Sequence, residues 1–220
     1  AGGVTDVLVS NQIVGTAKCA RLAALARRAR IGVCADHPDQ IGGYALAARA
    51  AGVVLHVLVE IDVGAARCGA PTVEAAVALA QRIEAAEHLT FDGLQAYHGS
   101  AQHIRGHGER RQAIENAGAR VRATVDALSG VGLTCRTIGG AGTGSFRFET
   151  AHGLWNELQP GSYCFMDADY AQNLDTEGAE RGEFEHALFV ASTVMSAAAP
   201  GIAVLDAGHK ASAIDSGLPS

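Results

Sequence analysis

Residues 139–145, GGAGTGS, contain the residue types that proteins use to hold an anion. Their glycines allow backbone N–H groups to converge on a phosphate, and Thr143 and Ser145 could add hydroxyl donors. A helix that begins near Thr143 would favour the same negative charge at its N-terminus. No lysine follows the glycines and the stretch comes late in the chain, so a Walker or Rossmann phosphate loop is not indicated. The alternative interpretation is a flexible connection between two domains.

Arg67 lies in the stretch EIDVGAARCG, residues 60–69, among small residues that would let its guanidinium reach a ligand. A guanidinium there could pair with an anionic oxygen of that ligand. The alternative is a structural ion pair with Asp62 of the same stretch.

Tyr97 belongs to the stretch GLQAYHG, residues 93–99. Because side chains alternate along a strand, Gln95 and Tyr97 would point the same way, and Tyr97 could stack on a ring or hydrogen-bond to it. The alternative is a core tyrosine with a capped hydroxyl. The nearby histidines, His98, His103 and His107, match no standard zinc spacing, and residues 103–111 are predicted to form a solvated loop.

Residues 159–170, QPGSYCFMDADY, again combine a glycine, a hydroxyl and an aromatic ring. They could supply a second phosphate contact, and an interdomain turn is the alternative. Asp167 and Asp169 could be acid or base groups or could cap loop backbone, and their spacing favours neither interpretation.

Short β-branched or apolar runs alternate with runs of helical periodicity through the first part of the chain. The predicted strands cover 6–11, 31–36, 55–62, 91–99 and 134–140, and the predicted helices cover 16–30, 40–52, 72–87 and 109–130. The strands are apolar at nearly every position, which is expected of a parallel sheet with helices on both faces. The fold class is therefore α/β, either a barrel or a doubly wound sheet. In both, ligands bind at the carboxyl ends of the strands.

The rhythm changes after residue 150. Residues 184–197 and 202–215 are predicted to be antiparallel strands joined through a turn near Pro200 and Gly201. A second, β-rich domain is therefore expected to begin in this part of the chain.

Composition argues against two classes of partner. The formal net charge is -6, with 17 basic and 23 acidic side chains mixed along the chain, so no cationic face is available for a nucleic acid. No apolar run approaches the ~18 residues that a membrane span needs. The five cysteines lack CxxC spacing, so neither a disulfide framework nor a zinc knuckle is indicated. A secretory leader is not recognisable, which favours a cytoplasmic location.

Several stretches, taken in order, resemble the group of D-threonine aldolase, 3-hydroxy-D-aspartate aldolase and D-serine dehydratase, which are alanine-racemase-like (fold type III) enzymes that use pyridoxal 5'-phosphate. They are DVLVSNQIVG, VLVEIDVGAARCG, GLQAYHGSAQH, GAGTGSF, ELQPGSYCFMDADY, FEHALFVASTVMS and DAGHKASAIDSGLP. The resemblance implies a partial (β/α)8 TIM-type barrel with about the last five βα units in residues 1–155. Residues 156–220 would hold the barrel end and the beginning of a D-serine-dehydratase-like β domain. The remaining barrel strands would precede Ala1.

The resemblance places Arg67 near the phenolic oxygen of the cofactor and Tyr97 beside its pyridine ring. It also implies a phosphate cradle made of two glycine-containing segments. The implied cradle residues are Gly140, Gly142, Thr143, Gly144, Gly161, Ser162 and Tyr163. No catalytic residue is identified within the sequence.

The lysine that forms the Schiff base with the cofactor is implied to lie outside this sequence. Lys18, on an arginine-rich predicted helix, and Lys210, in the predicted β domain, are the two lysines present and are not expected to replace it. The 220 residues alone are therefore expected to be inactive. The ligands of a divalent metal (Mn, Mg, Co or Zn) are implied to lie beyond Ser220, and a homodimer is implied for the full-length enzyme.

The implied activity is that of a carbon–carbon lyase of D-amino acid metabolism. It would cleave D-3-hydroxy amino acids, such as D-threonine or 3-hydroxy-D-aspartate, to glycine and an aldehyde such as glyoxylate. A D-serine-dehydratase-like ammonia-lyase is the second interpretation and a racemase the third. A non-catalytic pyridoxal-phosphate-binding protein is a further alternative, against which the start of a β domain argues.

Overall fold

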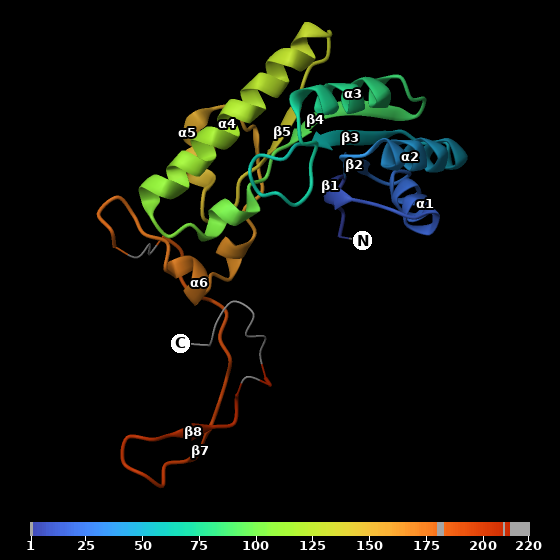
Figure 1. Ribbon diagram of the computed structural model, residues 1–220. Coiled ribbons are helices and arrows are strands. Elements are labelled where there is room, and N and C mark those ends of the chain that lie inside the picture. Colours follow the sequence, from blue (N-terminus) through green and yellow to red (C-terminus); the bar gives the residue numbers. More distant parts are fainter. Residues whose placement is uncertain (1, 180–182, 209, 212–220) are drawn as a thin grey trace.

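In the computed structural model, which describes residues 2–179, 183–208 and 210–211, the chain forms a six-stranded parallel sheet with helices beside it (Figure 1). The strands of this sheet are β1 (Asp6–Gln12), β2 (Arg30–Ala35), β3 (Leu55–Glu60), β4 (Leu89–Gln95), β5 (Thr137–Gly140) and β6 (Glu157–Leu158). The α-helices are α1 (Thr16–Leu25), α2 (Pro38–Ala51), α3 (Val73–Glu84), α4 (His107–Gly130), α5 (Phe146–His152) and α6 (Ala168–Ala171). Two 3₁₀ helices, η1 (Gly99–His103) and η2 (Ser162–Cys164), lie in loops.

The order of the strands identifies the sheet as part of a barrel. Each strand pairs in parallel with the next one along the chain, from β1 to β6, with no reversal of direction across the sheet. A doubly wound sheet would have a switch point where the strand order reverses. The consecutive helices α1 to α5 also pack on one another, as expected of a single layer outside a barrel. The prediction of a partial TIM-type barrel is therefore confirmed, with six strands in place of five.

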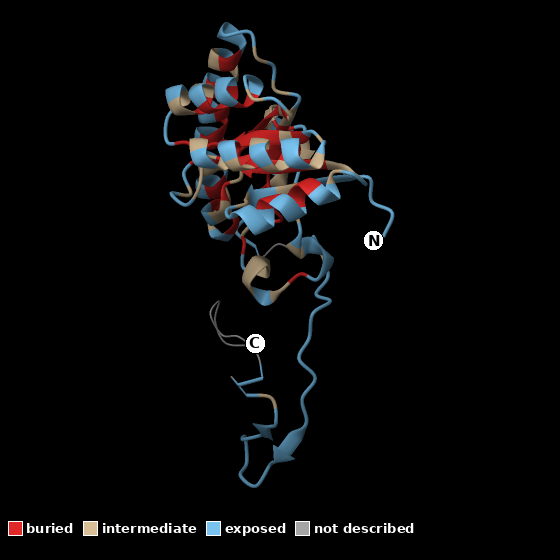
Figure 2. Cartoon of the chain, turned by 90° about the vertical axis from the view of Figure 1, so that its right-hand side faces the viewer, coloured by how far each residue is buried: buried red, intermediate tan, exposed pale blue. Residues whose placement is uncertain are grey.

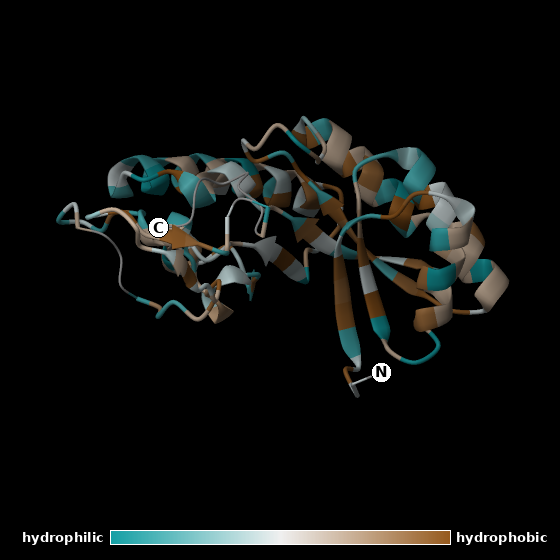
Figure 3. Ribbon diagram, turned by 90° about the horizontal axis from the view of Figure 1, so that it is seen from below, coloured by the Kyte–Doolittle hydropathy of each residue, from teal (hydrophilic) through white to brown (hydrophobic). Residues whose placement is uncertain are grey.

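The helices of the described chain cover one face of the sheet only, and the prediction of helices on both faces is wrong. Val57 and Val59 of β3 belong to the core beneath the helices, whereas Leu58 and Glu60 alternate with them and point to the opposite face. That inner face is also buried, since Leu58 is 2% exposed and Cys34 of β2 is fully buried. Strands of a curled sheet are apolar on both sides because the inner face closes on its own side chains. Figure 2 shows this buried centre, and Figure 3 shows the helices as an outer arc around the strands.

Local sequence signals explain how the helices are placed. At the start of α2, the ring of His37 accepts the Asp39 amide and the Gln40 side chain accepts the His37 amide. Gly52 ends the helix with a φ of 65°. The Thr72 hydroxyl accepts the Ala75 amide, 3.2 Å away, at the start of α3.

Three predicted segments of the barrel differ from the structure. The predicted strand at 91–99 ends at Gln95, so Tyr97 lies beyond the strand and the predicted alternation does not extend to it. The first predicted helix ends at Leu25, because Arg30 already belongs to β2 and pairs with Asp6 and Asp92. The predicted solvated loop at 103–111 instead includes the start of α4 at His107. Within it, the fully buried Arg110 donates hydrogen bonds to the carbonyls of Ile104 and Arg105.

The chain leaves the barrel after β6, a two-residue strand that pairs with β5 and that the sequence did not predict. The expected antiparallel pair is confirmed as β7 (Val194–Ser196) and β8 (Val204–Leu205), but it is much shorter than predicted, because residues 184–193 form no strand. Residues 209 and 212–215 of the second predicted strand lie outside the described residues. In Figure 2 the segment that carries β7 and β8 extends away from the sheet and is exposed. The division into residues 1–155 and 156–220 stays a prediction.

Candidate cofactor site

The predicted site residues all lie at the carboxyl edge of the large sheet. Arg67 is in the loop after β3, Tyr97 follows β4, the glycine turn follows β5 and residues 161–163 follow β6 (Figure 1). These strands are neighbours in the sheet, so four successive loops border one region.

The loop that carries Arg67 is held in shape by carboxylates. Asp62 Oδ1 accepts the amides of Gly64 and Ala66, at 2.9 and 3.1 Å, and Asp36 Oδ2 at the end of β2 accepts the amide of Gly69 at 2.9 Å. The side chain of Arg67 is exposed and forms no ion pair with another described residue. The alternative of an Arg67–Asp62 ion pair is therefore wrong, and the guanidinium can meet a ligand.

Tyr97 lies between Arg67 and the glycine turn. A Cβ atom built on Gly99 would be 3.4 Å from the Tyr97 ring and 4.0 Å from Arg67 Nη1, and one built on Gly142 would be 3.0 Å from Tyr97 Oη. Burial raises the pKa of Tyr97, with Tyr170 adding to the effect and Arg67 opposing it. Tyr97 is only half-buried, and no hydrogen bond joins its hydroxyl to another described residue, so the alternative of a capped core tyrosine is wrong.

The glycine turn is packed and hydrogen-bonded, which contradicts the interpretation as a flexible connection. Residues 138–145 are all buried. A Cβ atom on Gly140 would lie 2.5 Å from the Ala96 carbonyl oxygen and 2.6 Å from Trp155 Nε1, so only glycine fits there. The amides of Ser145 and Phe146 both donate to the Gly142 carbonyl and lead the chain into α5.

The two predicted halves of the cradle meet directly. The amide of Tyr163 donates to Thr143 Oγ1 at 3.0 Å, which joins the segment after β6 to the turn after β5. Within the part of the chain that the structure describes, the amides of Thr143, Gly161 and Ser162 have no hydrogen-bond acceptor. Free amides and hydroxyls at a concave backbone turn form a site of the type that binds phosphate.

Backbone strain accompanies these loops. Four non-glycine residues of the described chain have positive φ, and three of them are in site loops. They are Ala66 beside Arg67 (φ 51°), Ala141 in the glycine turn (φ 65°) and Met166 after η2 (φ 46°). Such conformations cost about 1–3 kcal/mol each and tend to occur at ligand sites.

Comparison with known proteins identifies the family of this chain. Residues 5–169 match the family described as alanine racemase, N-terminal domain. The chain belongs to that family.

Individual relatives are more specific than the family as a whole. The 3-hydroxy-D-aspartate aldolase of Paracoccus denitrificans (strain Pd 1222) is 48% identical over 99% of this chain, and the D-threonine aldolase of Arthrobacter sp is 43% identical over 100% of it. The crystal structure of D-threonine aldolase from Filomicrobium marinum matches 98% of this chain and 58% of its own, at 51% identity and a TM-score of 0.92. The chain spans about 57% of the length of the curated relatives it matches.

For a member of the alanine racemase family, the residues present fit pyridoxal phosphate. The fit rests on the free amides of Thr143, Gly161 and Ser162 beside a turn that a Cβ atom at position 142 would fill. The exposed guanidinium of Arg67 and the half-buried ring of Tyr97 lie next to that turn.

A histidine–carboxylate pair borders the site and was not recognised in the sequence as a unit. His103 Nδ1 lies 2.6 Å from Asp169 Oδ2, and Arg105 donates to Oδ1 of the same carboxylate. Burial opposes ionisation of Asp169, but the bonds from Arg105 and His103 outweigh it and lower the pKa of Asp169. Asp167, in contrast, accepts the Tyr170 amide and caps α6.

The three histidines considered for a metal site have separate contacts. His98 faces the Ser100 hydroxyl, His103 pairs with Asp169, and the ring of His107 packs on Phe148 with its centroid 5.1 Å away. In the described residues, no group of three or more His, Cys, Asp or Glu side chains could hold a metal ion. None of the described helices is long and apolar enough to cross a membrane.

Two buried carboxyl groups lie close to the site. Glu60, at the end of β3, accepts a 2.6 Å hydrogen bond from Gln12, and burial raises the pKa of its carboxyl. Glu149 in α5 is 1% exposed and accepts the Ser145 hydroxyl at 2.8 Å, while burial raises its pKa to about 6. Its other oxygen, Oε2, has no partner among the described residues.

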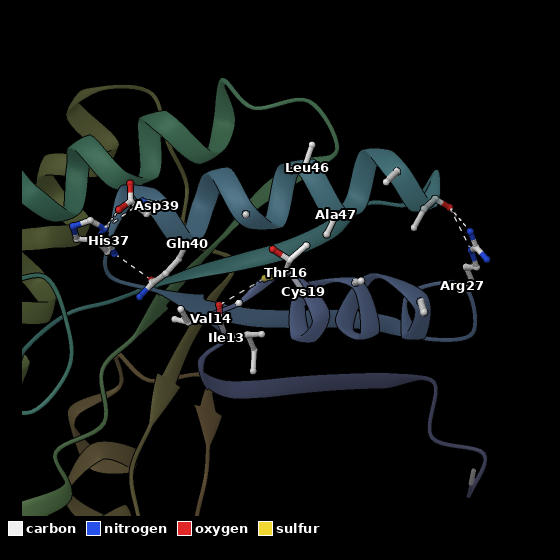
Figure 4. A pocket seen from close by; sticks show the side chains of 16 residues that line it. Ile13, Val14, Thr16, Cys19, Arg27, His37, Asp39, Gln40, Leu46 and Ala47 are labelled. Atoms are coloured by element: carbon white, nitrogen blue, oxygen red, sulfur yellow. Dashed lines mark hydrogen bonds and ion pairs between the residues drawn. The ribbon is translucent and has the colours of Figure 1, made fainter.

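A groove of about 650 Å³ between α1 and α2 contains none of the predicted site residues (Figure 4). Its middle is lined by small or apolar side chains such as Cys19, Ala20 and Ala47, and polar side chains lie toward its ends. It is therefore separate from the cofactor site.

Proposed function

We propose that the full-length protein that carries this sequence is a pyridoxal-phosphate-dependent aldolase. Its substrates would be D-3-hydroxy amino acids such as D-threonine or 3-hydroxy-D-aspartate, which it would cleave to glycine and an aldehyde. The observation that carries the proposal is the meeting of Arg67, Tyr97 and the two glycine segments at one edge of the barrel. The names of its relatives, 43–48% identical over nearly the whole chain, support this choice of reaction within the family.

Each site residue has a role in binding the cofactor. The amides of Thr143, Gly161 and Ser162, with the nearby hydroxyls, would hold the phosphate without any cationic side chain. The guanidinium of Arg67 would pair with the phenolic oxygen, and Tyr97 would limit the position of the ring. When bound, the cofactor supplies an electron sink for cleavage of a bond at the substrate Cα atom.

His103 is the group that we assign to proton transfer. Cleavage of the Cα–Cβ bond requires a base that removes the proton of the substrate β-hydroxyl. Asp169 fixes Nδ1 of His103 and would stabilise the ring when it is protonated, which leaves Nε2 as the atom that accepts the proton. The residue is at the end of η1, four positions after Gly99, and its ring packs against Tyr170 with the centroids 5.3 Å apart.

The remaining parts of the proposal rest on the resemblance. A divalent metal near the substrate hydroxyl, a homodimer and a cytoplasmic location stay predictions. The same holds for the expectation that neither lysine of this sequence binds the cofactor. Lys18 is exposed on α1 and lies apart from the four loops in sequence.

The products distinguish the aldolase from its closest alternative. We would incubate the purified full-length protein with D-threonine or 3-hydroxy-D-aspartate, with and without a divalent cation, and quantify glycine, aldehyde, ammonia and 2-oxo acid. Equal amounts of glycine and aldehyde are expected. Ammonia with a 2-oxo acid would support the dehydratase, and turnover of neither substrate would refute the proposal.

A further inference from the structure

The glycine turn depends on a residue from a different loop. Within the turn, the amides of Ser145 and Phe146 bond to the Gly142 carbonyl. The amide of Gly144 donates instead to Gln102 Oε1, 2.9 Å away and 42 positions earlier in the chain. Gln102 belongs to η1, which follows the loop of Tyr97.

The side-chain amide of Gln102 is fully buried, and both its oxygen and its nitrogen form hydrogen bonds. It is 0% exposed, and Nε2 donates to Ser145 Oγ at 2.7 Å and to the His98 carbonyl at 3.2 Å. These bonds also fix which way the amide points. A flipped amide would place its NH₂ group against the N–H of Gly144 and its oxygen against the His98 carbonyl, which are repulsive pairs.

The backbone of Gln102 is held as firmly as its side chain. Its carbonyl accepts Asn173 Nδ2 at 2.9 Å, which ties η1 to the segment after β6. A Cβ atom on Gly142 would lie 2.4 Å from Gln102 Oε1, and one on Gly144 would lie 2.5 Å from the Gln102 carbonyl oxygen. The two glycines are therefore what allow the turn to pack on Gln102.

We propose that Gln102 is the positioning residue of the phosphate cradle. It touches no ligand itself. It fixes the orientation of the turn at Gly142–Ser145 and therefore the direction in which the free amide of Thr143 points. Asn173 links the same residue to the segment after β6, which carries the other half of the cradle. This inference rests on the proposed function, because it assigns Gln102 to the site at which the cofactor phosphate would bind.

Removal of the Gln102 amide leaves the Gly144 amide and the Ser145 hydroxyl buried without that partner. Because the ligand must then order a turn that has lost these bonds, we expect affinity for the ligand to fall about tenfold. Maximal turnover at saturating cofactor should change far less, because no reacting group is removed.

The test compares Gln102→Met and Gln102→Glu with Gln112→Met in the full-length protein. Gln112 is an exposed residue of α4 whose side-chain amide, among the described residues, bonds to Asn116 alone, so its substitution is a matched control. The measurements are the dissociation constants of pyridoxal phosphate and of inorganic phosphate by calorimetry, the thermal unfolding temperature, and kcat at saturating cofactor. Q102M is expected to weaken both ligands about tenfold or more, while Q112M binds them as the wild type does.

Gln102→Glu supplies a readout that a purely structural role would not change. When it is ionised, the carboxyl group that this substitution introduces keeps an acceptor for the Gly144 amide but cannot donate to Ser145, whereas its protonated form can. The loss of affinity in Q102E relative to wild type should therefore become smaller as pH falls, and the loss in Q102M should not.

The outcomes separate this inference from the proposed function. If folded Q102M binds both ligands within twofold of wild type, or if the Q102E deficit does not vary with pH, Gln102 does not position the cradle. If the wild type itself binds neither ligand, the proposed cofactor site is wrong. If Q102M does not fold, Q102E and its pH dependence decide.

Discussion

Gly142→Ala tests the geometry of the cradle with a single methyl group. The added Cβ would lie 2.4 Å from Gln102 Oε1, 2.6 Å from Gln102 Cδ and 3.0 Å from Tyr97 Oη. All three atoms belong to buried or half-buried side chains, and the Gln102 amide cannot move without loss of its bonds to Gly144 and Ser145. Gly142 does not have a positive φ, so the effect is steric and not conformational.

The expected magnitude follows from the cost of overpacking. An extra methyl group in a close-packed site costs about 1–3 kcal/mol, or about 5- to 150-fold in an equilibrium constant. Because the turn can relieve the overlap only by moving away from Gln102, most of this cost should appear as weaker binding of pyridoxal phosphate. The full-length protein would be titrated with the cofactor and followed by absorbance and calorimetry, with thermal unfolding measured in parallel.

Two further variants make the result specific. Gly42→Ala in α2 is the matched control, since a Cβ atom there has nothing within 4 Å. In a Gln102→Ala background the clash partner is absent, so Gly142→Ala should cost clearly less than in the wild type, which is a non-additive pair. Cofactor affinity of G142A within twofold of wild type, or equal costs in the two backgrounds, would refute the reasoning.

Three other substitutions have distinct expected outcomes. Arg67→Gln should weaken the cofactor about tenfold but leave the unfolding temperature unchanged, because the guanidinium is exposed and has no ion pair with a described residue; a large loss of stability would contradict this. His103→Gln should lower kcat by about 10²- to 10⁴-fold at saturating cofactor without a comparable change in cofactor affinity, and an unchanged kcat would exclude the residue as the base. Glu149→Gln tests the raised pKa. The favourable contribution of protonated Glu149 is fully present below pH 4.5 and is lost as pH rises through about 6. The unfolding free energy of wild type should therefore fall by about 2 kcal/mol relative to that of E149Q between pH 4.5 and pH 7. The same difference between the two proteins at both pH values would show that the pKa is not raised.

The elements of the barrel could be predicted because their signals are local. Runs such as LHVLVE and helical periodicity in VEAAVALAQRIE occur within single elements, and the corresponding strand and helix lie within a few residues of their predicted bounds. The short strand at Glu157–Leu158 could not be found this way, since two residues have no periodicity. The prediction that helices cover both faces of the sheet was also wrong. A strand that is buried on both faces has the same apolar sequence whether its second face packs on helices or on the inside of a barrel.

The sequence by itself determined the parts of the candidate site that residue types reveal: the glycines of the turn, Arg67, Tyr97, and the segment at Gly161–Tyr163. Only the tertiary structure decided that Arg67 forms no ion pair with Asp62 and that the Thr143 hydroxyl accepts the Tyr163 amide. It also decided that Gln102 and the His103–Asp169 pair lie beside the glycine turn. These partners are 20 to 66 positions apart in the chain. Periodicity and spacing describe neighbours along the chain, whereas such contacts arise only when successive strands of the barrel bring their carboxyl ends to one edge.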